Sequence, residues 1–79
     1  MTTVKDFFNM TKLIYGKGVD IYIHPDTKSQ NRDNLCYNNE GEQHYHPDVL
    51  NKYGDCKIAF IETHFDTDEN IVSFDLYLL

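Results

Sequence analysis

The chain has 79 residues, of which 41% are hydrophobic and 14% aromatic, and its net charge is −6. A chain of this length builds one hydrophobic core, so residues 1–79 are expected to form a single globular domain, and the aromatic content excludes a disordered tail. The negative charge disfavours direct binding to nucleic acid or to an anionic membrane, because both require clustered lysine and arginine.

The N-terminal third predicts a helix, a strand and a loop. Thr3 is placed as an N-cap with Asp6 three residues later, and apolar residues recur at helical spacing, which indicates a helix over about residues 3–14. Residues 19–24 alternate with period two, which is typical of a strand. The polar residues 26–33 are expected to form a surface loop. The core-facing side chains of the strand are expected to be Val19, Ile21 and Ile23.

The rest of the chain predicts short elements followed by a hairpin. Residues 35–37 can form a short strand, while Pro47 and Gly54 have the positions of a first helical residue and of the residue after the last one. Residues 57–65 and 71–79 are β-rich runs joined by a polar loop, as in an antiparallel hairpin. We therefore expect an α+β domain in the order α-β-(β)-α-β-β. It has a small antiparallel or mixed sheet of three to four strands, an N-terminal helix and a short second helix.

Period-two alternation assigns two faces to the strands. The apolar row of the last strand is expected to lie under the first helix, and it comprises Val72, Phe74, Leu76 and Leu78. The opposite rows mix aromatic and acidic residues. If they share one sheet face, they form a surface with aromatic anchors among carboxylates, as the centres of interfaces do. The predicted partner-binding residues are Asp20, Tyr22, Phe60, Glu62, Asp75 and Tyr77, together with Asp66, Asp68 and Glu69 of the hairpin loop.

Three uses of this face are open from the sequence. In the first, the short second helix or the long loop covers the face, so that Phe60 and Tyr77 belong to the core. Alternatively, it is exposed for binding another protein, or it pairs two copies of the chain in a homodimer. Residues 58–79 contain five acids and no lysine or arginine, which suits a protein partner with a basic surface.

Candidate metal ligands occur in the middle of the chain. His44 and His46, flanked by Cys36 and Cys56, offer the four nitrogen and sulfur atoms that suit tetrahedral zinc. The spacing matches no zinc-finger pattern and no C-x-x-C occurs, so we expect no metal and no cofactor. The two cysteines could instead form a disulfide with each other or stay as two free thiols.

Catalytic motifs are not evident in the sequence. Asp66, Asp68 and Glu69 lack the glycine and the late glutamate of a calcium-binding EF-hand loop. Glu62 and His64 could act as an acid–base pair, yet no nucleophile elbow or glycine-rich phosphate loop accompanies them. We therefore expect a binding protein and not an enzyme.

No apolar run approaches the roughly 20 residues that span a bilayer, and the N-terminus lacks the basic and apolar regions of a secretion signal. Two cysteines do not make the disulfide framework of a small secreted domain. These features predict a protein of a reducing cytoplasm that does not enter a membrane.

Three segments, residues 2–7, 19–23 and 46–50, precede the closing hairpin, and together they resemble small proteins of low-GC Gram-positive bacteria and their phages. In size, acidity and aromatic content the chain is similar to phage-encoded anti-CRISPR proteins. The resemblance implies a stoichiometric inhibitor in the host bacterial cytoplasm. Such an inhibitor occupies the basic nucleic-acid-binding surface of a defence nucleoprotein, for example a CRISPR effector, or blocks its conformational change. A homo-oligomeric phage accessory or regulatory protein and a zinc-stapled structural domain are the alternatives.

Overall fold

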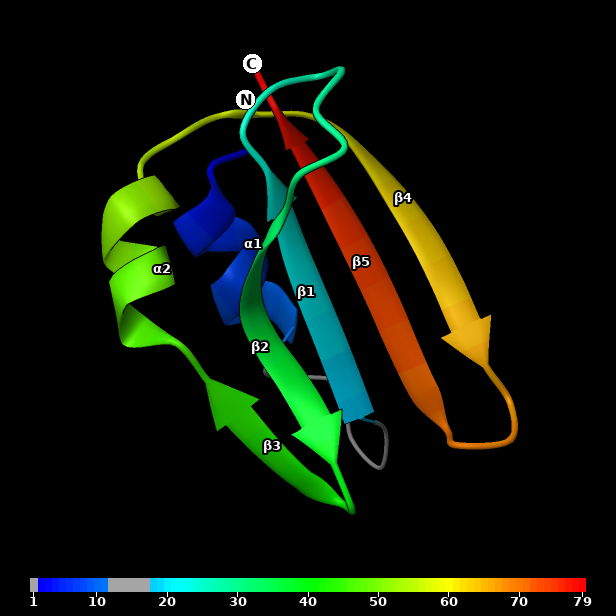
Figure 1. Cartoon of the computed structure of the whole chain (residues 1–79). Coiled ribbons are helices and arrows are strands. Elements are labelled where there is room, and N and C mark those ends of the chain that lie inside the picture. The colour runs from blue at the N-terminus through cyan, green and yellow to red at the C-terminus, as the bar shows by residue number, and fades with distance from the viewer. Residues whose placement is uncertain (1, 12–17) are drawn as a thin grey trace.

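The computed structural model describes residues 2–11 and 18–79, which form two helices and one five-stranded mixed sheet. In chain order the elements are α1 (Val4–Thr11), β1 (Gly18–His24), β2 (Asp33–Asn39), β3 (Glu42–Tyr45), α2 (Pro47–Tyr53), β4 (Ile58–Asp66) and β5 (Ile71–Leu78). The strands lie in the order β3-β2-β1-β5-β4, with β1 parallel to β5 and the other neighbours antiparallel. Helix α1 covers one face of the sheet, and α2 packs beside α1 and against β2 (Figure 1).

The α+β class and the mixed sheet agree with the sequence-based expectation, but the expected three to four strands and the order α-β-(β)-α-β-β are wrong. The difference is β3, which pairs with β2 from Cys36↔Tyr45 to Asn39↔Glu42. Sequence reasoning misses β3 because its residues are polar and lie at a sheet edge, so they show no apolar alternation. The turn before it has positive φ at Glu40 (53°) and Gly41 (82°), which is typical of a type I′ hairpin.

Helix α1 begins at a side-chain cap. The Thr3 hydroxyl oxygen accepts a hydrogen bond from the Asp6 backbone N–H at 3.2 Å, and the Asp6 carboxylate accepts one from the Thr3 N–H at 3.5 Å. The predicted cap is therefore confirmed, as a reciprocal capping box. The helix is described as far as Thr11, and the expected continuation to residue 14 lies outside the described residues.

The core lies between α1 and the sheet face that it covers. The predicted alternation of β1 is confirmed, because Val19, Ile21 and Ile23 are all buried. The apolar row of β5 is buried as well, apart from the half-buried Phe74, whose ring meets Phe7 of α1 edge to face at 5.0 Å. The side chains with no exposed surface come from α1 and three strands, and they are Val4, Ile21, Ile23, Leu35 and Leu76.

The C-terminal hairpin is confirmed within one residue at the strand ends. β4 and β5 pair antiparallel from Ile58↔Leu78 to Asp66↔Ile71, with one irregularity between Ile58 and Phe60. β4 therefore forms one outer edge of the sheet and β3 forms the other.

Helix α2 begins at Pro47 and Gly54 follows its last residue, as expected. Gly54 is required because a side chain would not fit at this position. A left-handed backbone is not the reason, since φ at Gly54 is −54°. A Cβ atom at Gly54 would lie 2.6 Å from the Leu50 carbonyl oxygen, which is closer than such atoms approach. Neither helix among the described residues has the length and apolar character that crossing a bilayer takes.

Candidate functional site

The sheet face opposite α1 carries the aromatic and acidic rows. Strand pairing places Tyr22 beside Asp75, Asp75 beside Glu62, and Tyr77 beside Phe60. Residues that pair directly across strands point to the same side of a sheet. The structure therefore brings onto one face the predicted residues Asp20, Tyr22, Phe60, Glu62, Asp75 and Tyr77.

Three rings form a stack across this face, one from each of β1, β5 and β4. His24 stacks on Tyr77 with 4.0 Å between ring centroids, and Tyr77 stacks on Phe60 at 4.4 Å. His24 is buried, Tyr77 is half-buried and Phe60 is 43% exposed, so the stack runs from the covered part of the face to its open side. Desolvation raises the pKa of Tyr77, and the carboxylates of Glu62 and Asp75 raise it further. The phenol is therefore a neutral hydrogen-bond donor around neutral pH.

The Asp75 carboxylate is enclosed, with 7% of the residue exposed. Its Oδ1 atom accepts hydrogen bonds from His24 Nε2 at 2.7 Å and from Arg32 Nη1 at 3.1 Å. The Arg32 guanidinium also lies 3.8 Å from the centroid of the Tyr22 ring, as a cation–π contact. Two basic side chains of the fold therefore already bind this carboxylate.

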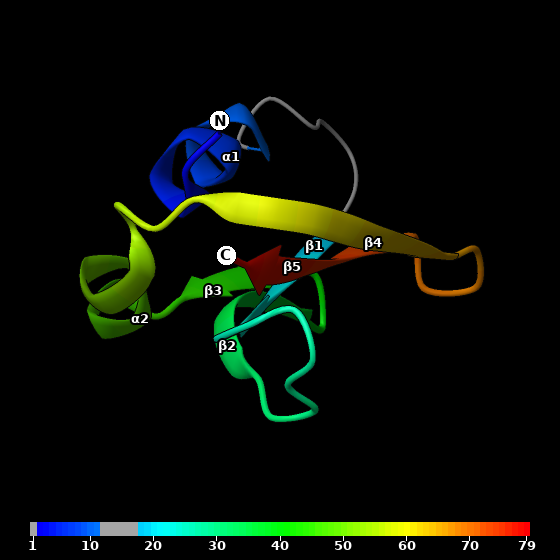
Figure 2. The ribbon, with the colours of Figure 1, turned by 90° about the horizontal axis from the view of Figure 1, so that it is seen from above.

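The loop of residues 25–32 covers this part of the face. Figure 2 shows the loop on the side of the sheet opposite α1. The Ser29 carbonyl oxygen lies 3.0 Å from His24 Nδ1, and both partners of the imidazole accept hydrogen bonds, so the ring satisfies both when each nitrogen carries a proton. Of the three uses open from the sequence, covering by the long loop therefore applies to the β1 side of the face.

Sequence reasoning does not place His24 and Arg32 in the site. Neither residue belongs to an apolar pattern, and Arg32 lies 43 positions before Asp75 in the sequence. A signal nevertheless exists. Asp75 lies between Phe74 and Leu76 in a β-rich run, where a carboxylate that becomes buried needs a basic partner, and Arg32 is the single arginine of the sequence.

Asp20, the other predicted acid of β1, also has a structural role. Its Oδ1 atom accepts the Asn38 backbone N–H at 2.8 Å, and this bond ties β2 to β1. The nearby Val19 N–H donates to the side chain of Gln43 at 3.0 Å. At this end of the β1–β2 pairing, hydrogen bonds from backbone N–H groups to side chains thus replace backbone–backbone hydrogen bonds. Asp20 is half-buried and already engaged.

The open part of the face follows β4 and the loop that joins it to β5. Phe60 and Glu62 are exposed on β4, and the loop acids are exposed beyond them. Asp66 Oδ1 accepts the backbone N–H groups of Asp68 at 3.0 Å and Glu69 at 3.2 Å, which orders the loop. We call this region the acidic-aromatic surface, and it comprises Phe60, Glu62, Tyr77, Asp66, Asp68 and Glu69.

A second acidic turn adjoins this surface. The β2–β3 turn and the β4–β5 loop lie at the same end of the sheet (Figure 1). They border a hollow of about 380 Å³, and Glu40 from the turn and Glu69 from the loop both line it. Residues 58–79 contribute no lysine or arginine to this end.

The four candidate zinc ligands are not brought together. Among residues 2–11 and 18–79, no three His, Cys, Asp or Glu side chains are grouped to hold a metal ion. Cys36 is buried with its Sγ atom 3.5 Å from the Val19 carbonyl oxygen, while His44 and His46 pack against the Tyr37 ring. Cys36 and Cys56 are free thiols, so the disulfide between them is not formed either.

The two thiols are expected to differ strongly in reactivity. Burial raises the pKa of the Cys36 thiol from 9.0 to about 12, whereas Cys56 is only half-buried. Because the thiolate is the nucleophile, iodoacetamide at about pH 8 should alkylate Cys56 at least about a hundredfold faster than Cys36 in the folded protein. Peptide mass spectrometry checks this ratio, and urea should abolish the difference. Similar rates in native buffer would contradict a buried Cys36.

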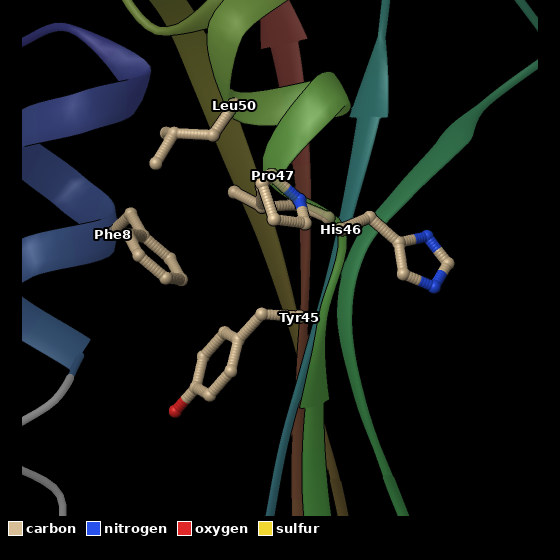
Figure 3. A pocket seen from close by; sticks show the side chains of 6 residues that line it. Phe8, Tyr45, His46, Pro47 and Leu50 are labelled. Atoms are coloured by element: carbon tan, nitrogen blue, oxygen red, sulfur yellow. The ribbon is translucent and has the colours of Figure 1, made fainter.

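An apolar pocket of about 310 Å³ lies between α1, α2 and the end of β3. Figure 3 shows Phe8, Tyr45 and Leu50 pointing toward a common space, while the His46 imidazole points away from it. The Phe8 and Tyr45 rings meet edge to face at 5.4 Å. The described residues that line this pocket are mainly hydrophobic.

Comparison with known proteins adds no functional assignment. No protein-family model matches the chain, and neither a curated protein nor a solved structure matches it.

Proposed function

We propose that this protein acts by binding and not by catalysis, as a stoichiometric inhibitor of a host defence nucleoprotein in the manner of a phage anti-CRISPR protein. Its acidic-aromatic surface docks onto a basic nucleic-acid-binding surface of that target. The observation that supports this most is the Phe60 ring, which is 43% exposed and held in place by stacking on Tyr77. A fixed, exposed aromatic ring loses little conformational entropy on binding, and such rings are frequent hot spots of interfaces.

The charge around Phe60 supports a basic partner. Glu62 adjoins the ring on β4, and the ordered loop presents Asp68 and Glu69. Carboxylates of one sign steer a basic protein surface toward productive encounter, and they form charge-assisted hydrogen bonds with its arginine and lysine side chains. The contact set is therefore the acidic-aromatic surface. Asp20, Tyr22 and Asp75 belong to the fold beneath it.

Capture from a lysate of a low-GC Gram-positive host tests the proposal. The tagged protein is expected to retain a nucleoprotein at low salt, and added nucleic acid should compete with it for the captured partner. Phe60→Ala and the double reversal Asp68→Lys with Glu69→Lys should each lower retention about tenfold or more. High salt should weaken retention by the unaltered protein, because the attraction is electrostatic.

Matched controls separate this surface from general effects. Tyr45→Ala removes an aromatic ring that is 50% exposed on the opposite edge strand, and Asp48→Lys with Asp55→Lys makes the same charge change in the first turn of α2 and just after its end. Both controls should retain the partner as the unaltered protein does. If no nucleoprotein is captured, or if the controls lose as much as the test variants, the proposed function is wrong.

A further inference from the structure

The outer edge of β4 is long and largely uncovered. Within the described part of the chain, only its start is occupied, where the Ile58 N–H donates to the Thr2 carbonyl oxygen at 3.0 Å and Thr3 forms a bridge with Lys57. From residue 60 to residue 66, no strand of the described chain pairs with this edge, and every residue is exposed. The stretch contains no proline or lysine, the residues that commonly protect such edges. It is therefore a template for another strand.

We propose that a second copy of this chain pairs with this edge, β4 against β4 and antiparallel, about a twofold axis at Thr63. Thr63 then lies opposite Thr63 of the second copy, and Glu62 lies opposite His64. Antiparallel edge pairing of this kind is self-complementary, since each copy presents the same strand to the other. The two five-stranded sheets become one continuous sheet.

Charge complementarity selects this register. The Glu62 carboxylate and the His64 imidazole lie on the same side of β4 and face each other twice across the axis. A carboxylate accepts the imidazole N–H whether the ring is neutral or charged. Moving the axis to residue 62 would place two glutamates opposite each other, which is destabilising, and moving it to residue 64 would remove both favourable pairs.

The α1 side of β4 is complementary in the same register. Ile61 and Phe65 are 39% and 50% exposed, and they lie opposite each other across the axis. Ile61 lines a groove of about 450 Å³ together with Phe7 and Met10 of α1. Phe65 of the second copy is placed at the mouth of this groove. Apolar contacts on one side and Glu62–His64 pairs on the other thus support the same dimer.

The dimer goes beyond the proposed function and does not rest on it. A twofold axis perpendicular to the sheet leaves the Phe60 stacks and the acidic loops of both copies on the same side. The capture experiment uses variants at positions 60, 68 and 69, whereas the dimer is tested at positions 62 and 64. Failure of one proposal is therefore distinguishable from failure of the other.

Sedimentation equilibrium over a series of protein concentrations tests the dimer. The unaltered protein should pass from the monomer mass to twice that mass as the concentration rises. His64→Glu sets carboxylate against carboxylate at two symmetric places, so it should raise the dissociation constant about tenfold or more. Adding Glu62→Lys to His64→Glu should restore the dissociation constant to within about threefold of the original value.

Glu42→Lys is the matched control, because it makes the same charge change on β3, the opposite edge strand. Added to His64→Glu, it should not restore the dimer. Circular dichroism should show that all these variants keep the fold. A protein that stays monomeric at every concentration would overturn the proposal and leave the edge for a strand of another protein. Restoration by Glu42→Lys as strong as that by Glu62→Lys would overturn it too.

Discussion

Asp75→Ala is expected to lower the free energy of unfolding by about 3 kcal/mol or more, because it leaves a buried basic partner without its acceptor. The Asp75 side chain is 9% exposed and that of His24 is 6% exposed, so water cannot replace the 2.7 Å hydrogen bond between them. Urea unfolding followed by circular dichroism measures the loss. The sequence alone places Asp75 among the partner-binding residues, whereas its burial and its hydrogen bonds to His24 and Arg32 give it a role in the fold.

Two other variants separate the contribution of the buried His24–Asp75 pair from that of the more exposed Arg32–Asp75 pair. Arg32→Ala should cost only about 1 kcal/mol or less, because the arginine side chain is 47% exposed and its ion pair with Asp75 is partly solvated. Asp75→Asn keeps an oxygen acceptor and should cost about 1 to 2 kcal/mol. An Asp75→Ala variant no less stable than the Arg32→Ala variant would show that the His24–Asp75 bond does not stabilise the fold.

Local signals predict much of this fold from the sequence. The reciprocal bonds of Thr3 and Asp6 depend on residues three apart, and the alternation of Val19, Ile21 and Ile23 depends on residues two apart. The final hairpin needs only two β-rich runs and a polar loop between them. In each case the residues that determine the structure are neighbours in the sequence.

Long-range contacts explain what the sequence does not predict. β3 is polar, and its place is fixed by the turn at Glu40 and Gly41 and by pairing with β2. Alternation predicts that the site residues share one sheet face, but it does not predict that the loop of residues 25–32 covers part of this face. Arg32 and Asp75 are 43 positions apart in the sequence, and no local sequence pattern predicts their contact. The predicted acidic face is consequently divided into a covered part on β1 and an open part on β4.

Ile21→Ala is expected to lower the free energy of unfolding by about 3 to 4 kcal/mol, since removal of a fully buried aliphatic side chain loses transfer free energy and leaves a cavity. Ile21 has no exposed surface, and β1 lies in the middle of the sheet. A domain of this length has a total stability of roughly 4 to 12 kcal/mol, so the variant should be partly or largely unfolded near body temperature.

Ile61→Ala is the matched comparison, because it removes the same atoms from a residue that is 39% exposed at the β4 edge. It should cost about 1 kcal/mol or less when unfolding is measured on dilute monomer. At concentrations where the proposed dimer forms, the cost should grow, because dimer formation stabilises the folded state by mass action. Equal losses for the two variants in dilute solution would contradict the assignment of the core to the α1 side of β1. A loss at Ile61 that does not depend on concentration would remove this residue from the proposed dimer contact.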